Sequence, residues 1–209
     1  MKLDWKKGEK EYYLPKTSPA IIKVPAFKFF MIEGEGNPND PFFGDYISVL
    51  YSLSYAVKMS PKKGNSPAGY VEYTVYPLEG VWDLKEEARN MDHGKIDKNS
   101  LVFNLMIRQP DFVDTDFAAK IIETTASKKP HPLLEKVRFG IIEEGKCVQM
   151  MHLGSYDDEP GSFARMHEFC KANSLERMSM VHREIYLSDA RKVTADKLKT
   201  VLRFRITDS

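Results

Sequence analysis

The order of sequence patterns in the first half of the chain recurs in the second half. "AIIKVPAFKFFMIEGEG" and "KVRFGIIEEGKCVQMMHLGSY" each carry two apolar runs and end near a glycine. The runs are interrupted at Val24-Pro25 in the first segment and at Glu144-Gly145 in the second, so each predicts strand, turn and strand. A repeat of about 100 residues indicates a duplicated folding unit, because solenoid repeats have periods of about 20 to 50 residues.

A helix is predicted after each of these segments. "NPNDPFFGDYISVLYSLSYAVKM" has apolar residues every three or four positions, with Asn39 or Asp40 as the cap and Pro41 near the first position. "DDEPGSFARMHEFCKANSL" again begins with acidic residues and a proline. Its apolar stripe consists of Phe163, Met166, Phe169 and Cys170.

Two further strands are predicted in each half. They are "GYVEYTVYPLEGVW" and "SLVFNLMIRQP" in the first half, and "SMVHREIYL" and "KTVLRFRI" in the second. Alternation in the last of these places Leu202, Phe204 and Ile206 on one face and Arg203 and Arg205 on the other. A helix in "TDFAAKIIETTASKK", with Thr115 as its N-cap, closes the first half. We therefore expect an α+β fold of tandem pseudo-symmetric βαββ repeats, residues 20–128 and 135–209, within a single domain 1–209. Antiparallel sheets with helices on one face would leave their other faces to form a ligand cleft between the halves.

Charge and composition exclude several classes of partner. The 209 residues include 31 basic and 30 acidic side chains, so no net field attracts nucleic acid or an anionic membrane. The N-terminus lacks the apolar run of a secretory signal, and no stretch approaches the roughly 18 apolar residues of a membrane span. We expect a cytoplasmic protein in which Cys147 and Cys170 are buried, reduced thiols.

One carboxylate stands out in "SMVHREIYLSD". Strand alternation places His182, Glu184 and Tyr186 on one face and Arg183 on the other. Aligning "EIYLS" with "TVYPL" matches Glu184 with Thr74, so a charge breaks the repeat and would lie in the cleft. A carboxylate held among aromatic rings loses hydration and becomes a general base or a strong attractor for a cationic ligand. The alternative is an exposed edge-strand glutamate paired with Arg183 or His182.

Other candidate ligand-binding residues lie in the first half. Tyr70 and Tyr76 would face the acid from the equivalent strand, and Trp82 would offer a stacking surface, although core packing is the alternative for Trp82. Glu33 lies near a predicted strand end, where a solvated turn residue is the alternative. Arg108 would reach a ligand, against the alternative of a surface or carboxylate-paired arginine.

The sequence predicts no metal site, cofactor or covalent nucleophile. No H-x-x-x-H, C-x-x-C or G-x-S-x-G motif is present. The histidines are His93, His131, His152, His167 and His182. The acidic run at 157–159 is interpreted as favourable charge at a helix start, since Pro160 follows it.

Several segments together resemble the GyrI-like (gyrase-inhibitor-like) small-molecule-binding proteins. They are "FFMIEGEGNPN", "YPLEGVW", "LMIRQPDF", "EEGKCVQMMHLGSYDDE" and "HREIYLSDARKVTADKLKTVLR", which span residues from about 27 to 206. More narrowly, the chain resembles the stand-alone bacterial subgroup that includes cyclopropanoid cyclopropyl hydrolases. The resemblance implies a duplicated SHS2 fold with a cleft between the halves and Glu184 as its functional acid. Arg183 departs from the pattern, which has a second histidine there.

The resemblance also implies a function. Glu184 would help water open the strained cyclopropane of DNA-alkylating natural products of the duocarmycin and yatakemycin type, a detoxifying hydrolase activity without a cofactor. Tyr186 would act as a donor to the developing phenolate, while His182, Trp82 and Tyr76 line the site.

The rival interpretation is a non-catalytic binding module for flat aromatic or cationic drugs, which acts by effector sensing, sequestration or gyrase modulation. A gyrase or regulatory partner is therefore left open. Direct DNA binding is not expected, because only about 20 residues precede the first strand, too few for a helix-turn-helix.

Overall fold

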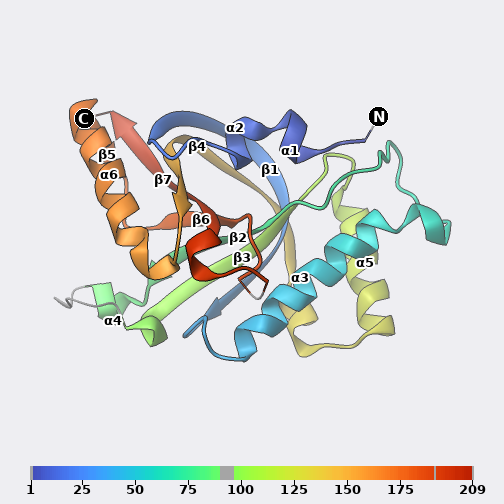
Figure 1. The fold of residues 1–209 in the computed structure, drawn as a ribbon. Coiled ribbons are helices and arrows are strands. Elements are labelled where there is room, and N and C mark those ends of the chain that lie inside the picture. The colour runs from blue at the N-terminus through green and yellow to red at the C-terminus, as the bar shows by residue number, and fades with distance from the viewer. Residues whose placement is uncertain (1, 90–96, 191, 209) are drawn as a thin grey trace. The chain divides into compact units, whose positions relative to one another are not determined.

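The computed structural model describes residues 2–89, 97–190 and 192–208 (Figure 1). They divide into two compact units. The first unit comprises Met1–Leu3 and Phe27–Ile142, and the second comprises Asp4–Ala26 and Glu143–Ser209. The boundaries fall inside two long strands, β1 (Ala20–Glu35) and β4 (Arg138–Leu153). That the two units act as the single domain predicted from the sequence stays a prediction.

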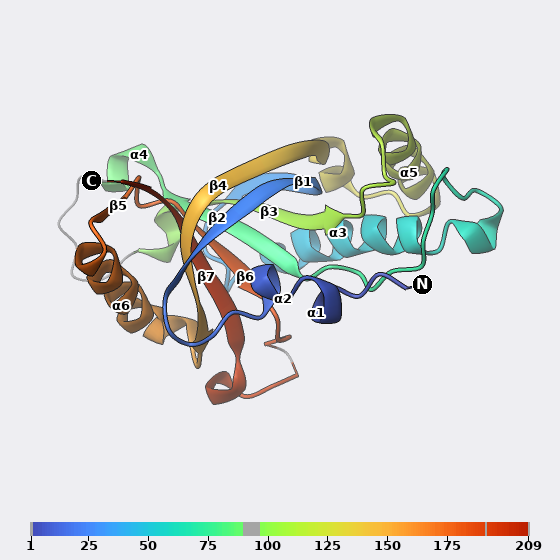
Figure 2. The same ribbon diagram turned by 90° about the horizontal axis from the view of Figure 1, so that it is seen from above.

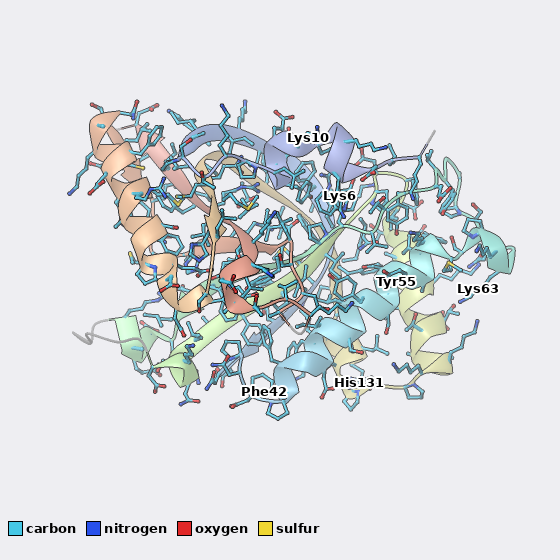
Figure 3. All side chains as sticks on the ribbon, viewed as in Figure 1. Lys6, Lys10, Phe42, Tyr55, Lys63 and His131 are labelled. Atoms are coloured by element: carbon cyan, nitrogen blue, oxygen red, sulfur yellow. The ribbon has the colours of Figure 1, made fainter. Side chains whose placement is uncertain are left out.

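The first unit contains an antiparallel sheet in which β3 (Leu101–Gln109) lies between β1 and β2 (Leu78–Leu84). Helix α3 (Phe42–Lys58) follows β1 and packs against β3 and against α5 (Thr115–Lys128), as Figure 2 shows for the two helices. Apolar side chains spaced three or four residues apart on α3 are buried, as predicted: Leu50, Leu53 and Val57. Figure 3 labels Phe42, the first residue of this helix, and Tyr55, which lies in its last turn.

The second unit contains an antiparallel sheet in which β7 (Lys199–Asp208) lies between β4 and β6 (His182–Tyr186). A short strand, β5 (Leu175–Arg177), pairs with the end of β7. Helix α6 (Glu159–Ala172) covers one face of this sheet. The apolar core between them consists of Val148, Met150, Met166, Cys170, Leu175, Leu202, Phe204 and Ile206. The alternation predicted for β7 is confirmed, since Leu202, Phe204 and Ile206 enter this core.

The remaining elements are short. Helices α1 (Trp5–Gly8) and α2 (Lys10–Tyr13) belong to the second unit, and Figure 3 labels Lys6 and Lys10 on them. Helix α4 (Glu86–Arg89) belongs to the first unit. Single 3₁₀ turns span Pro61–Lys63, Lys98–Ser100, Pro132–Lys136, Tyr156–Asp158 and Ala195–Lys197. Over the described ranges, no helix has both the length and the apolar character that crossing a membrane requires.

Apart from the short strand β5, both units have the order strand, helix, strand, strand, and in both the last strand lies between the other two. The predicted α+β fold of tandem βαββ repeats is therefore confirmed. Two glycines fix how the repeats correspond. Gly36 and Gly154 have φ values of 109° and 122°, a region that favours glycine. Their N–H groups donate to the carbonyls of Leu101 and Leu198 respectively, each close to the start of the middle strand.

This correspondence corrects the alignment made from the sequence. Because Leu101 and Leu198 correspond, the residues four positions after them also correspond, and these are Leu105 and Leu202. The ladders pair Leu105 with Gly80 of β2 and Leu202 with Glu184 of β6. Glu184 therefore corresponds to Gly80 and not to Thr74. The repeat is still broken by a charge at this position, because the second unit carries Glu184 where the first unit has a glycine.

Three element boundaries also differ from the sequence prediction. β1 and β4 are each one continuous strand and not two strands with a turn. Pro25 lies within β1, and Gly145, with φ of 71°, lies within β4 without ending it, because a single irregular residue bends a strand without stopping its pairing. Helix α5 is capped by Asp114, whose side chain accepts the N–H of Phe117, and not by Thr115.

Candidate functional site

Glu184 lies in the middle of β6 and is 8% exposed. It is paired with Leu202, which belongs to the core beneath α6. On the same face, the ring of His182 contacts the ring of Phe163 on α6, with centroids 4.8 Å apart. The acid therefore lies on the face that α6 covers. We expected it on the face without a helix, so this part of the prediction is wrong.

Two neighbours on β6 hold the Glu184 carboxylate. His182 Nε2 lies 3.1 Å from Oε1, and the Tyr186 hydroxyl donates to Oε2 over 2.7 Å. An imidazole with a hydrogen on Nε2 donates it to this carboxylate, and Nδ1 lies 3.3 Å from the carbonyl oxygen of Met180. The predicted common face of His182, Glu184 and Tyr186 is confirmed. The alternative of an exposed glutamate is wrong, although its suggested partner His182 does bind the acid.

A second phenol lies beside these three residues. The rings of Tyr156 and Tyr186 are edge to face, with centroids 5.9 Å apart. Burial raises the pKa of Tyr156 to about 12, and the charges of Glu184, Glu159 and Asp189 add to the increase. Tyr156 is also 37% exposed, so the phenol beside Tyr186 reaches the surface of the unit.

A second carboxyl group, Glu159, was missed by the sequence analysis. It is the first residue of α6 and is 7% exposed. Burial raises the pKa of Glu159 well above its usual range. The charge of Glu184, a side-chain hydrogen bond to Glu184 and the charge of Asp157 add to this increase. The signal was present in the sequence, because the apolar stripe of α6 at Met166 and Cys170 extends back to position 159.

The opposite face of β6 carries a separate charged cluster. Arg183 Nε lies 2.9 Å from Glu144 Oε1, and Arg203 Nη1 lies 2.8 Å from Glu144 Oε2. Burial alone would raise the pKa of Glu144, but the charges and hydrogen bonds of the two arginines outweigh it and hold this pKa below its usual range. Arg203 also bonds Gln149 and the carbonyl of Tyr12. Arg183 thus points away from Glu184, as alternation predicted.

Trp82 lies in the first unit and is 5% exposed. Its ring packs against Phe43 and Phe103, with centroids 5.9 and 5.4 Å away. Gly34 makes room for this cluster, since a Cβ there would lie 2.5 Å from the Phe103 ring and 2.8 Å from Tyr46. These contacts match the core-packing alternative, and a ligand role for Trp82 stays a prediction.

Arg108 and Tyr76 lie together in the first unit. The guanidinium of Arg108, which is 5% exposed, lies 3.4 Å from the centroid of Phe27 and 4.6 Å from that of Tyr76. The alternative of a surface arginine is therefore wrong. Tyr70 donates its hydroxyl to the carbonyl of Lys58 over 2.9 Å. Tyr70 and Tyr76 precede β2, so they are not on the strand where the sequence analysis placed them.

Glu33 is exposed on β1 and lines an open hollow of about 330 Å³. The other residues of this hollow are Met31, Glu135, Lys136 and Arg138. Four of its five residues are charged, whereas small-molecule pockets are mostly apolar. The ligand-binding role of Glu33 stays a prediction.

Side chains that are cross-strand neighbours at corresponding positions of the two sheets are apolar in the first unit and polar in the second. In the first unit the row Gly34, Phe103 and Trp82 is filled by aromatic rings. The corresponding row of the second unit is His152, Thr200 and Tyr186. His152 Nδ1 lies 2.9 Å from the Ser162 hydroxyl of α6, and both side chains are buried. The space between sheet and helix is thus an aromatic core in one unit and a hydrogen-bonded site in the other.

The described residues contain no group of three or more His, Cys, Asp and Glu side chains placed to hold a metal ion. His93, one of the five histidines considered in the sequence, lies outside those residues.

Comparison with known families gives a match over nearly the whole chain. The model of the GyrI-like small molecule binding domain matches residues 17–207. The chain belongs to this family. It is therefore a GyrI-like small-molecule-binding protein, as its sequence motifs suggested.

Solved structures agree with this assignment. A hydrolase from Listeria innocua is 34% identical, with a TM-score of 0.88 over 98% of this chain and 100% of that one. A second structure, also of a hydrolase from Listeria innocua, is 35% identical, with a TM-score of 0.89 over 99% and 100% of the two chains. The C-terminal domain of EcmrR shares the fold at 10% identity, with a TM-score of 0.56 over 92% and 98%. No curated protein matches the chain.

Proposed function

We propose that this GyrI-like protein is a hydrolase that adds water to cyclopropanoid DNA-alkylating compounds, and that Glu184 activates the water. The observation that carries the proposal is the burial of the Glu184 carboxylate between His182 and Tyr186. A desolvated carboxylate held in a fixed orientation has the properties of a general base. The two Listeria innocua structures described as hydrolases support the reaction class, and the substrate class rests on the sequence resemblance.

The reaction needs only groups that this site contains. The cyclopropane of such compounds is conjugated to a dienone, so its ring carbon is already electrophilic. A water oxygen forms the new C–O bond while Glu184 accepts a proton from that water. The C–C bond of the ring breaks, and its electron pair moves through the conjugated system to the carbonyl oxygen, which becomes a phenolate. Protonation of this oxygen completes the addition of one water molecule.

Tyr186 is the proposed donor to the developing phenolate. In the present structure its hydroxyl donates to Glu184, so it serves the substrate oxygen only after giving up that bond. Tyr156, with its ring against Tyr186, is the second phenol within the same unit. We assign Tyr186 to the reaction and His182 to the orientation of Glu184.

The test is to incubate the wild-type protein and Glu184→Gln with a duocarmycin-type cyclopropanoid and to follow the compound by mass spectrometry. Glutamine keeps the shape of the side chain but cannot accept the proton. Glu168→Gln, an exposed position on α6, is the matched control. We expect wild type and Glu168→Gln to add one water and Glu184→Gln to leave the compound intact.

A binding module without catalysis is the alternative, in which the same carboxylate anchors a flat or cationic drug for sensing, sequestration or gyrase modulation. The description of the family as small-molecule binding favours it equally. If the wild-type protein binds the compound and returns it unchanged, this alternative replaces the hydrolase. A detoxifying hydrolase would act in the cytoplasm, the location predicted from the sequence.

A further inference from the structure

Glu159 and Glu184 form a pair of buried carboxyl groups inside the second unit. Glu159 comes from the first turn of α6 and Glu184 from the middle of β6. They are 7% and 8% exposed, and their side chains are joined by a hydrogen bond. An ionised carboxylate has no hydrogen to donate, so two carboxyl groups that share a hydrogen bond must hold a proton between them.

The hydrogen-bond partners decide which oxygen atoms carry the charge. Both oxygens of Glu184 accept a hydrogen bond, one with His182 and one from Tyr186. Glu159 Oε1 is buried and has no hydrogen-bond partner among the described residues. Donors stabilise the ionised form of a carboxyl group, and their absence favours the neutral form. The proton of the pair therefore belongs to Glu159.

The start of a helix would ordinarily favour an ionised Glu159, because the first turn carries a partial positive charge. Burial and the repulsion from Glu184 and Asp157 oppose it and raise the pKa of Glu159, so they outweigh the helix. The titratable groups around the pair on the neighbouring elements are Tyr156, Asp157, His182, Tyr186 and Asp189. Of these, only His182 can bring a positive charge.

We propose that Glu159 is a positioning residue for Glu184: it holds the proton of the pair and donates it in a hydrogen bond to Glu184, which fixes the orientation of that carboxylate. This inference rests on the proposed function of Glu184 as the base. It assigns to Glu159 no contact with substrate.

The first unit shows that the fold itself does not need such a pair. The residue corresponding to Glu184 is Gly80, and α3 begins with Phe42 and has Pro41 as its cap. The same space there is filled by aromatic rings, including those of Phe43 and Trp82. Two buried carboxyl groups stabilise a fold less than aromatic rings in the same space. Their presence in the second unit is therefore more easily explained by a function than by stability.

The experiment compares kcat, KM and the pH profile of wild type, Glu159→Gln, Glu159→Ala and the matched control Glu168→Gln with a cyclopropanoid substrate. Glutamine keeps a neutral donor at every pH, so we expect kcat within about threefold of wild type. The pH profile of Glu159→Gln should lose the alkaline decline caused by ionisation of Glu159. Alanine removes the donor, and kcat should fall about 10- to 100-fold with KM changed less than about threefold. Glu159→Ala with wild-type kcat and pH profile would overturn the inference.

A second measurement keeps the inference testable if the wild-type protein proves not to be a hydrolase. Carboxyl groups can be titrated by ¹³C NMR in proteins labelled at glutamate. We expect Glu159 to stay protonated at neutral pH in wild type and to titrate at lower pH in Glu184→Gln, where the charge that repels it is gone. Both groups ionised at neutral pH would overturn the inference by itself, whereas an inactive wild type with a protonated Glu159 overturns only the proposed function.

Discussion

Replacing Glu159 by glutamine should change how the stability of the protein depends on pH. The folded protein keeps the proton on Glu159 to a higher pH than the unfolded chain does, where an ordinary glutamate ionises near 4.5. Between these two pKa values the unfolded state binds one proton fewer than the folded state. Stability from this group is therefore fully present below the unfolded pKa and decreases as pH rises toward the folded one.

The size of this pH effect on stability follows from a difference of one bound proton between the folded and unfolded states. Each pH unit in this window lowers the free energy of unfolding by about 1.4 kcal/mol, so raising the pH from about 6 to about 8 removes about 2.7 kcal/mol. For a chain of this length that is a decrease in Tm of about 5 to 11 °C. Glu159→Gln should lack this decrease. His167, whose pKa is lowered mainly by burial, titrates in both proteins and cancels in their difference.

Urea unfolding at several pH values measures the effect directly. We expect the stability of Glu159→Gln minus that of wild type to rise by about 1.4 kcal/mol per pH unit between about pH 6 and 8. Glu168→Gln, exposed on the same helix, should parallel wild type. A constant difference between Glu159→Gln and wild type over this range would refute the reasoning, because it would mean that Glu159 ionises in the folded protein as it does in the unfolded chain.

Two further predictions concern the framework of the units. Glu144→Gln should lower the free energy of unfolding by about 3 to 5 kcal/mol, because it leaves the buried side chains of Arg183 and Arg203 without their carboxylate. Urea unfolding measures this loss, with the exposed position Glu143→Gln as the control. A loss equal to that of the control would contradict the prediction. Gly34→Ala should lower stability by about 1 to 3 kcal/mol, because the new Cβ would lie 2.5 Å from the Phe103 ring, and a thermal melt matching wild type would show that the cluster can move aside.

Local patterns in the sequence predicted the repeat and the faces of its strands. Period-two alternation placed Leu202 in the core, Arg203 on the opposite face, and His182 beside Glu184 and Tyr186. These predictions held because side-chain direction in a strand depends only on the backbone.

Features that depend on long-range packing were not predicted correctly from the sequence. Pro25 and Gly145 are typical of turns, yet both lie in continuous strands whose partners come from distant parts of the chain. Glu159 resembled an ordinary acidic residue at a helix start, and its burial depends on how α6 packs on the sheet. Trp82 could stack on a ligand or fill a core by its chemistry alone, and the rings that surround it could not be identified from its neighbours in sequence.

The central claim is that the Glu184 carboxylate takes the proton of the attacking water. The most direct measurement is the rate at which ¹⁸O from labelled water enters a cyclopropanoid substrate with wild-type protein and with Glu184→Gln, at substrate concentrations where both proteins are saturated. We expect the label in the ring-opened product of wild type and a rate at least about 100-fold lower for Glu184→Gln. Equal rates of label incorporation by the two proteins would contradict the claim.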